Sequence, residues 1–432
     1  MNKRISTFFT PFSINQVLLR TSMYRNAISR ESVEKKQLDK FNAIWKDAYI
    51  NLQFYKNWKA MYSLPDSIST LRELEGWPII TKQMLQIKIE NLQRDTAKVS
   101  TCVFTGGSTG EPLRLPTWSD RFTSSSQWIG RVAYGVMPGD RTFLLWGHHH
   151  LYGKGIKRKI NQAKRKIKDT LLNMCRVSAY DLSEDAMGRA FNTYKEFKPQ
   201  FVIGFSASVL AFCRINSLCK ISHAPKAVLC TAGPLSNAEK EEIECFFKAP
   251  VCMEYGSVEA GVMAYTEPET QHYRVFWDTH LLQGFTDETG ETRNIVTRLT
   301  PCYFPLIRYD IGDCLDLLDT THMESIYEIN TVKGRPSDII QLKNGVSFFG
   351  AIIGDCVKQV PAVVASQLIV LEEAIFEIHV VARQQLADID FDLIKNRLKL
   401  VVKGLENDVF KIKQVDKLIV TQGGKIPLVI RV

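Results

Sequence analysis

The chain has 432 residues, more than one hydrophobic core usually organises, so we expect two or three domains. Its composition of 45% hydrophobic, 23% charged and 10% aromatic residues is that of a globular protein and excludes long disordered regions. The net charge of +9 is small for this length and gives no reason to expect a nucleic-acid partner.

The ten cysteines are scattered without a C-x-x-C pair, and most lie in apolar runs such as AVLCTAG. We therefore expect reduced core thiols rather than disulfides or a zinc site. The N-terminal segment is interrupted by Thr10, Pro11 and Asn15 and lacks the apolar region of a signal sequence, and no apolar span of 18 residues follows. These features predict a cytoplasmic protein without a transmembrane segment, for which peripheral membrane contact stays open.

Residues 1–95 are predicted to form a helical segment that packs on a larger domain. Four aromatic residues in this segment recur at helical spacing: Phe41, Trp45, Tyr49 and Phe54. The spacing indicates one apolar helix face, so we interpret these residues as core rather than as a binding site.

From Val99 onward, short apolar runs alternate with amphipathic stretches. The runs RTFLLWG, QFVIGF, KAVLCTAG and PVCMEYG predict strands, and EDAMGRAFNTYKEFK and NAEKEEIECFFK predict helices. This alternation is typical of an α/β fold with a largely parallel sheet. We assign residues 96–334 to this large domain.

Within the large domain, the segment from Lys154 to Lys168 contains eight lysines and arginines. Two interpretations are open. The segment is either a solvated helix face, or a patch for an anionic cofactor tail, a carrier protein or the inner membrane surface.

After about residue 270 the pattern becomes more β-like, and residues 335–432 form a smaller α+β unit that we expect to be a mobile lid. Its predicted elements are the segment DIIQLKNGVSFF, a helix over 349–360, the strands SQLIVLE and FEIHVVA, a helix in DFDLIKNRLKLVVKGL and a final strand in DKLIVTQ.

The segment TGGSTGEP, Thr105 to Pro112, is the most informative part of the chain. Its glycines and hydroxyl residues can turn backbone N–H groups toward one anion, so it predicts a phosphate-binding loop; a polar hairpin turn is the alternative. The P-loop pattern is excluded because Glu111 and Pro112, rather than a lysine, follow Gly110.

Four further motifs follow: YGSVE from Tyr255, RYDIGD from Arg308, KGRPSDIIQLKNG from Lys333 and GGKIP from Gly423. Each is unspecific alone. Together with the glycine loop, in this order and at these spacings, they resemble the adenylate-forming superfamily of acyl-CoA synthetases, adenylation domains and luciferases. They are most similar to its phenylacetate–CoA ligase branch, which includes homologues from capsular polysaccharide clusters. The resemblance runs from about residue 100 to residue 427, and TRLTPCYFPLIRYDIGD is its most specific stretch.

The resemblance implies a large N-terminal domain, a small C-terminal lid and a site between them. The chemistry implied is attack of a carboxylate on the α-phosphate of ATP, followed by acyl transfer, with CoA as the expected acceptor. In-line attack on phosphorus needs charge neutralisation and alignment rather than a protein nucleophile.

The implied nucleotide site has a residue for each part of ATP. Glu259 would hold magnesium, Tyr255 would stack on adenine, Ser257 would lie near the α-phosphate, and Asp313 would bind the ribose hydroxyls with Arg335 beside it. The loop residues that would bind the β- and γ-phosphates are Thr105, Gly106, Gly107, Ser108, Thr109 and Gly110, and Gly256 belongs to the Tyr255 motif.

The implied catalytic lysine is Lys425, whose ammonium would bridge the substrate carboxylate and the α-phosphate. The acyl and acceptor pocket would be lined by Trp146, His148, Tyr152, Phe205 and Gly233. An aromatic lining suits an aryl or compact acid, although each of these residues could equally be packing.

The chain departs from the family pattern at the hinge, where Ser337 replaces the usual aspartate and Pro336 precedes it. Some relatives carry a metal-binding cysteine after the YGxxE motif; none is present here, so we expect no zinc. Two alternatives remain open. One is transfer of the acyl group to an amine, sugar or carrier protein in surface-polysaccharide biosynthesis. The other is a degenerate nucleotide-binding homologue without turnover.

Overall fold

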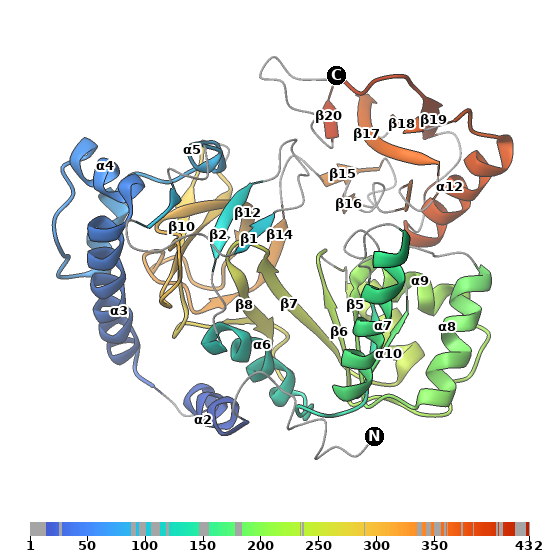
Figure 1. The fold of residues 1–432 in the computed structure, drawn as a ribbon, viewed down its shortest axis with the longest axis horizontal. Helices are drawn as coiled ribbons and strands as arrows, with labels where there is room; N and C mark the ends of the chain where they lie inside the picture. The colour runs from blue at the N-terminus through green and yellow to red at the C-terminus, as the bar shows by residue number, and fades with distance from the viewer. Residues whose placement is uncertain are drawn as a thin grey trace.

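A central sheet flanked by helices, a second sheet beside it and a smaller C-terminal sheet make up the fold (Figure 1). The computed structural model describes residues 14–25, 28–87, 92–94, 101–104, 113–117, 121–146, 155–177, 184–233, 235, 237–288, 290–334, 339–342, 347–349, 356–357, 360, 362–372, 375–382, 384–402, 405, 409–419 and 429–431. Among these residues, no helix combines the length and apolarity needed to cross a bilayer.

The N-terminal part of the chain is helical, as its sequence predicts. It contains α2 (Ile14–Arg25), α3 (Arg30–Asn51), α4 (Gln53–Met61), the 3-10 helix η1 (Leu71–Gly76) and α5 (Lys82–Leu85). Phe41 and Trp45 of α3 are fully buried, and the Trp45 ring lies edge-on to Trp77 at a centroid distance of 4.9 Å. The aromatic residues expected to be core therefore pack together.

The central sheet has eight strands in the order β13-β9-β8-β7-β6-β5-β3-β4. Its parallel half contains β3 (Thr142–Leu145), β4 (Met174–Val177), β5 (Phe201–Phe205), β6 (Ala227–Thr231) and β7 (Val251–Ser257). The antiparallel half adds β8 (Gly261–Thr266), β9 (Tyr273–Val275) and β13 (Glu328–Ile329). The four parallel strands expected from the sequence are confirmed as β3, β5, β6 and β7.

Both faces of the parallel half are covered by helices, which explains its nearly continuous apolar sequences. On β5, Val202 belongs to one buried cluster and Phe201 and Ile203 to another, because alternate side chains point to opposite faces. One face packs on α8 (Glu184–Phe197), α9 (Ser206–Ile215) and α10 (Asn237–Phe247). The other packs on α2 and α6 (Arg121–Ala133).

The second sheet is antiparallel, in the order β10-β11-β12-β14. Its strands are β10 (His280–Thr286), β11 (Thr292–Arg298), β12 (Tyr309–Asp316) and β14 (Thr331–Gly334). Two antiparallel pairs lie outside it, β1 (Thr101–Phe104) with β2 (Arg114–Thr117), and β15 (Ile339–Gln341) with β16 (Ser347–Phe349). The β-like pattern after residue 270 is thus an antiparallel sheet beside the parallel one.

The C-terminal sheet has the order β19-β18-β17-β20. It contains β17 (Val363–Glu372), β18 (Ile375–Ala382), β19 (Phe410–Gln414) and β20 (Val429–Arg431), with α12 (Asp388–Val401) beside it. The Arg214 guanidinium on α9 donates to the Leu400 carbonyl in the last turn of α12 and also pairs with Glu242 on α10. This contact joins the C-terminal unit to the helices of the large domain.

The prediction of a strand in DKLIVTQ is wrong for residues 416–419, the part of this segment that the structure describes, because these residues form no strand. The Gln367 side chain on β17 accepts from the Ile419 N–H at 2.8 Å and donates to the Ile419 carbonyl at 2.9 Å. The N–H and the carbonyl of Ile419 therefore both bond to the Gln367 side chain. In a strand they would bond to the backbone of a neighbouring strand.

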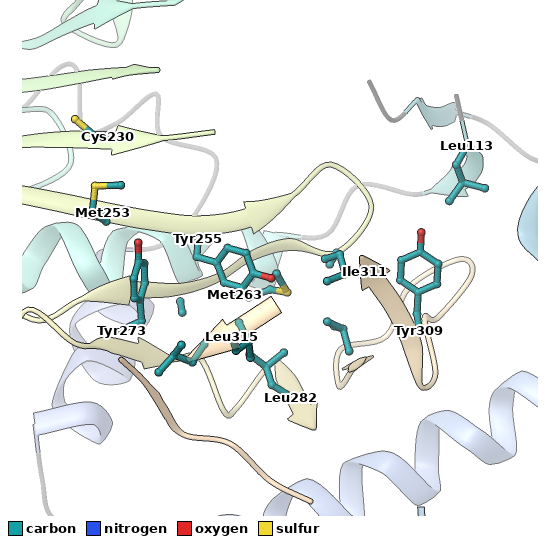
Figure 2. Close-up of a cluster of buried hydrophobic side chains, with 14 of the residues drawn as sticks. Leu113, Cys230, Met253, Tyr255, Met263, Tyr273, Leu282, Tyr309, Ile311 and Leu315 are labelled. Atoms are coloured by element: carbon teal, nitrogen blue, oxygen red, sulfur yellow. The ribbon is translucent and has the colours of Figure 1, made fainter. Parts of the chain in front are cut away.

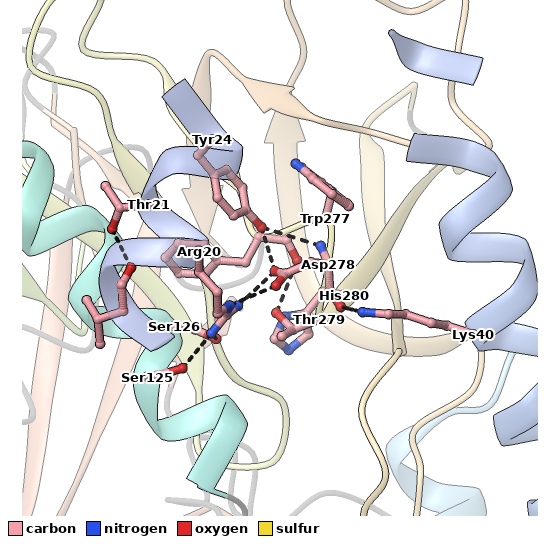
Figure 3. A network of polar contacts seen from close by, with 12 residues as sticks. Arg20, Thr21, Tyr24, Lys40, Ser125, Ser126, Trp277, Asp278, Thr279 and His280 are labelled. Atoms are coloured by element: carbon pink, nitrogen blue, oxygen red, sulfur yellow. Dashed lines mark hydrogen bonds and ion pairs between the residues drawn. The ribbon is translucent and has the colours of Figure 1, made fainter. Parts of the chain in front are cut away.

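The helix α2 is fixed to the large domain by a buried ion pair (Figure 3). Arg20 donates from Nε and Nη2 to the two Asp278 carboxylate oxygens, each at 2.8 Å, and from Nη1 to the hydroxyls of Ser125 and Ser126 on α6. Tyr24 donates to the same carboxylate at 2.6 Å. The side chains of Arg20 and Asp278 are 4% and 3% exposed, so each charge depends on the other.

We predict that Arg20→Ala lowers the free energy of unfolding by about 3–5 kcal/mol, because it leaves the Asp278 charge buried without its ionic partner. Urea unfolding measures the effect. The matched control is Lys395→Ala, which removes an exposed i,i+3 partner of Asp392 and should change stability by less than about 0.5 kcal/mol. A similar small change in both variants would contradict the assignment.

Candidate active site

Four of the expected site positions meet at one edge of the central sheet. Because β3, β5, β6 and β7 are parallel neighbours, their carboxyl ends lie at the same edge, where α/β proteins commonly bind ligands. Trp146 follows β3, Phe205 ends β5, Gly233 follows β6, and Tyr255 lies near the end of β7. The rings of Trp146 and Phe205 pack at a centroid distance of 4.4 Å and an interplanar angle of 36°.

The loop after β6 is held in a strained conformation. Ala232 has a φ of +64°, a left-handed conformation that residues other than glycine and asparagine rarely adopt. The Ser206 hydroxyl, at the start of α9, lies 2.7 Å from the Gly233 carbonyl and 3.2 Å from the Thr231 carbonyl, both of which accept from it. The structure therefore fixes the backbone at Gly233 against the neighbouring strand end, beside the aromatic pair.

Tyr255 links the two sheets. It is buried among apolar side chains such as Met263 and Leu315 (Figure 2). Its hydroxyl donates to the Asp313 carboxylate on β12 at 3.0 Å and accepts from Asn294 Nδ2 on β11 at 2.8 Å. Burial and the Asp313 charge raise the pKa of Tyr255 well above its usual value, so the phenol keeps its proton as a donor.

The RYDIGD motif explains why Asp313 reaches this position. On β12, three residues separate Asp310 from Cys314, whereas only Asn294 separates their partners on β11, so β12 bulges toward Tyr255. Asp310 accepts from the Gly312 N–H at 2.8 Å, and Gly312 has a φ of +89°, which glycine adopts without a steric penalty. The motif thus shapes a bulge that presents the Asp313 carboxylate.

A clamped turn between β7 and β8 carries Glu259. The Ser257 hydroxyl accepts from the Ala260 N–H at 3.1 Å, and His280 Nε2 donates to the Ala260 carbonyl at 2.9 Å. At Gly256 the register shifts, and an added Cβ would lie 2.5 Å from the Gly261 carbonyl oxygen, so only glycine fits. The turn is therefore fixed on both sides of Glu259.

Glu259 has the properties of a ligand for a hard cation. Its side chain is half-buried, and within the described part of the chain its carboxylate makes no hydrogen bond or ion pair. Mg²⁺ is usually bound by one or two carboxylates together with substrate phosphates, so a single unpaired carboxylate at a strand-end turn fits this ion.

Several expected site residues lie outside the described part of the chain. They are the loop Thr105–Pro112, His148, Tyr152, Arg335 and Lys425, together with the hinge at 336–338. The structure brings together Tyr255 with Asp313 and Trp146 with Phe205.

Sequence reasoning missed two residues, Asn294 and His280. Asn294 is fully buried, and its Oδ1 has no hydrogen-bond partner among the described residues. The fully buried His280 has a pKa lowered to about 4 by desolvation, so it is neutral, with Nδ1 accepting from the Thr279 hydroxyl at 3.0 Å. The available signal was weak: Asn294 begins the run NIVTRLT, and His280 precedes the apolar pair Leu281-Leu282.

Comparison with solved structures identifies the fold. A 2-hydroxyisobutyryl-CoA ligase in its postadenylation state, in complex with R3-HIB-AMP, matches with a TM-score of 0.59 over 94% of this chain and 91% of that one, at 14% identity. The same ligase in complex with 2-HIB-AMP and CoA matches with a TM-score of 0.57, the same coverage and 14% identity. The chain therefore has the fold of the adenylate-forming ligases, as the motif order predicts.

Comparison of sequences adds a particular relative. Protein CapK of Staphylococcus aureus is 23% identical over 323 residues, which cover 71% of this chain and 68% of that protein. The chain is thus a distant homologue of Protein CapK. No family model matches the sequence.

We predict that Gly256→Ala lowers the free energy of unfolding by about 1–3 kcal/mol, because the new methyl group must displace the β8 backbone. Thermal or urea unfolding measures this change. The matched control is Gly188→Ala on α8, where nothing lies within 4 Å of the added Cβ, and it should be neutral or stabilising. Equal effects at both sites would show that the β7–β8 contact is not tight.

The low pKa of His280 predicts a pH-dependent stability. Because the pKa falls from 6.5 to about 4 on folding, the unfolded chain binds more protons between these values, and stability is lost as pH falls through this window. This histidine should contribute a loss of about 1 kcal/mol between about pH 7.5 and pH 5.5.

Urea unfolding at the two pH values tests this prediction. His280→Asn should remove that part of the pH dependence. His272→Asn, a substitution that does not contact the turn between β7 and β8, should retain it. An unchanged pH dependence in His280→Asn would refute the assignment.

Proposed function

We propose that this protein is an ATP- and magnesium-dependent adenylate-forming ligase that acts on a carboxylic acid. A carboxylate oxygen forms a bond to the α-phosphorus of ATP, the bond from that phosphorus to the bridging oxygen breaks, and pyrophosphate leaves. A thiol, for which we propose CoA, then attacks the acyl carbon, releases AMP and loses its proton. Attack of the substrate carboxylate on phosphorus needs positioning and charge neutralisation rather than a protein nucleophile.

The observation that carries this proposal is the placement of Asp313. It projects from a bulge of β12, and the buried Tyr255 hydroxyl holds its carboxylate at 3.0 Å. An oriented, ionised carboxylate can accept hydrogen bonds from both ribose hydroxyls of ATP. Tyr255 is therefore proposed as an orienting residue as well as a contact for adenine.

The remaining roles rest on the motifs. Glu259 would hold Mg²⁺, which neutralises phosphate charge, and the fixed turn would keep this carboxylate in place. We propose that the Thr105–Gly110 loop binds the β- and γ-phosphates, that Ser257 and Arg335 lie by the α-phosphate and ribose, and that Lys425 is carried to the site by a lid of residues 335–432.

The aromatic pair at the sheet edge supports a compact acid as substrate. Trp146 and Phe205 pack beside the fixed Gly233 backbone, and such a surface suits an aryl or short branched acyl group. The fold likeness to 2-hydroxyisobutyryl-CoA ligase, solved with an acyl-adenylate and CoA, supports CoA over an amine, a sugar or a carrier protein as the acceptor. We place the reaction in the cytoplasm.

The proposal is tested by pyrophosphate release from the full chain with ATP and Mg²⁺, across aryl, short branched, hydroxy, fatty and amino acids, each with and without CoA. Lys425→Ala should lower the rate by about 10²–10³-fold, because it removes charge stabilisation at the reacting phosphate.

Asp313→Ala should weaken ATP binding. Tyr255→Phe should raise the KM for ATP more than it lowers kcat, because it removes one hydrogen bond that orients the Asp313 carboxylate.

The matched control is Lys417→Ala, an exposed lysine of the same unit, which should leave the rate unchanged. Acid-independent pyrophosphate release, or a rate insensitive to Lys425→Ala, would contradict the proposal. ATP binding without release for any acid would instead support a nucleotide-binding protein without turnover.

A further inference from the structure

The helix α7 (Gly155–Leu171) carries an exposed stripe of isoleucines. Ile156, Ile160 and Ile167 are 78%, 48% and 62% exposed. At about 100° per residue these positions fall within roughly 40° of one another, so they share one helix face. We call these three residues the isoleucine stripe. Three exposed isoleucines in one line are unusual on a helix that is otherwise strongly polar.

The stripe points away from the protein, because the opposite face of α7 holds the helix in place. Asp169, 7% exposed, pairs with Arg176 on β4 through two bonds of 2.9 and 3.2 Å, and with Arg165 at 3.3 Å. Asp169 lies roughly 200° around the helix from the centre of the stripe. The inner contact of α7 is therefore ionic, and the isoleucine stripe is exposed to solvent.

Lysines line the stripe on both sides. By the same helical geometry Lys159 and Lys166 flank one edge, and Lys157, Lys164 and Lys168 flank the other. All five are exposed. The only acidic residue of the helix, Asp169, is buried in its ion pairs, so the outward half of α7 carries positive charge alone.

We propose that α7 docks this protein on an anionic lipid bilayer. The helix, roughly 25 Å long, would lie in the plane of the surface. The isoleucine stripe would enter the acyl boundary, and the flanking lysines would extend to the lipid phosphates. A solvated helix face, or a site for an acidic protein or a cofactor tail, accounts for the lysines but leaves the outward isoleucines without a role. A bilayer with anionic headgroups complements both the lysines and the isoleucine stripe.

This inference does not depend on the proposed reaction, because no residue of α7 is assigned to the candidate active site. Docking would hold the ligase at a membrane surface, where an acid or acceptor carried by a lipid would be concentrated. The exposed positions of the stripe also mean that their substitution should leave the fold intact.

The test is flotation of the full chain with vesicles of phosphatidylcholine alone, or with about 30% phosphatidylglycerol. We expect binding to the anionic vesicles, weakened at about 0.5 M salt. Ile156→Ser, Ile160→Ser and Ile167→Ser together should lower the partition coefficient by at least about tenfold. Lys157→Gln, Lys159→Gln, Lys164→Gln and Lys166→Gln together should lower it by a similar factor.

The matched control combines Leu218→Ser and Ile389→Ser, which remove two apolar side chains that are 99% and 75% exposed outside α7. It should bind as the unmodified protein does. Circular dichroism and urea unfolding establish that each variant is folded.

Two results would overturn the proposal. One is no binding to anionic vesicles. The other is binding that the lysine variant loses and the isoleucine variant keeps, which would indicate a purely electrostatic patch for an acidic protein or nucleotide.

Discussion

The hydrogen bond between Tyr255 and Asp313 is the contact through which two sheets share one site. Tyr255 belongs to the strand at which the central sheet changes from parallel to antiparallel, and Asp313 belongs to the second sheet. Because the phenol is buried and keeps its proton, it donates one hydrogen bond that helps to orient the Asp313 carboxylate in the bulge. The orientation of the Asp313 carboxylate therefore depends on how the second sheet is placed relative to the central sheet.

Both candidate carboxylates come from places where strand register breaks. Asp313 lies in the extra segment of β12, and Glu259 follows the irregularity at Gly256. A regular ladder alternates side chains between two faces, whereas a bulge redirects one of them without ending the strand. Neutral, buried side chains bond to the residues around both carboxylates: Asn294 donates to the Tyr255 hydroxyl, and His280 donates to the Ala260 carbonyl.

Apolar periodicity predicted the parallel strands β3, β5, β6 and β7 and the helices α8 and α10. The positions at the carboxyl edge came from the family resemblance. The sequence did not predict the roles of Asn294 and His280, because a buried polar residue in a strand does not show which group it will bond to. The DKLIVTQ strand was predicted wrongly because its apolar pattern is that of a strand, while the Gln367 amide bonds the backbone of Ile419. For the Thr105–Gly110 loop and Lys425, the motif remains the sole basis of their assignment.

The contact of Arg214 with the Leu400 carbonyl bears on how the C-terminal unit is attached. Arg214 also makes three hydrogen bonds to Glu242 within the large domain, at 3.1 to 3.2 Å. If α12 moved away, the guanidinium would keep its counter-charge, and the electrostatic loss at Arg214 would be one charge-assisted hydrogen bond of about 1.5–3 kcal/mol. Opening of this contact would therefore leave no isolated ion in the protein interior.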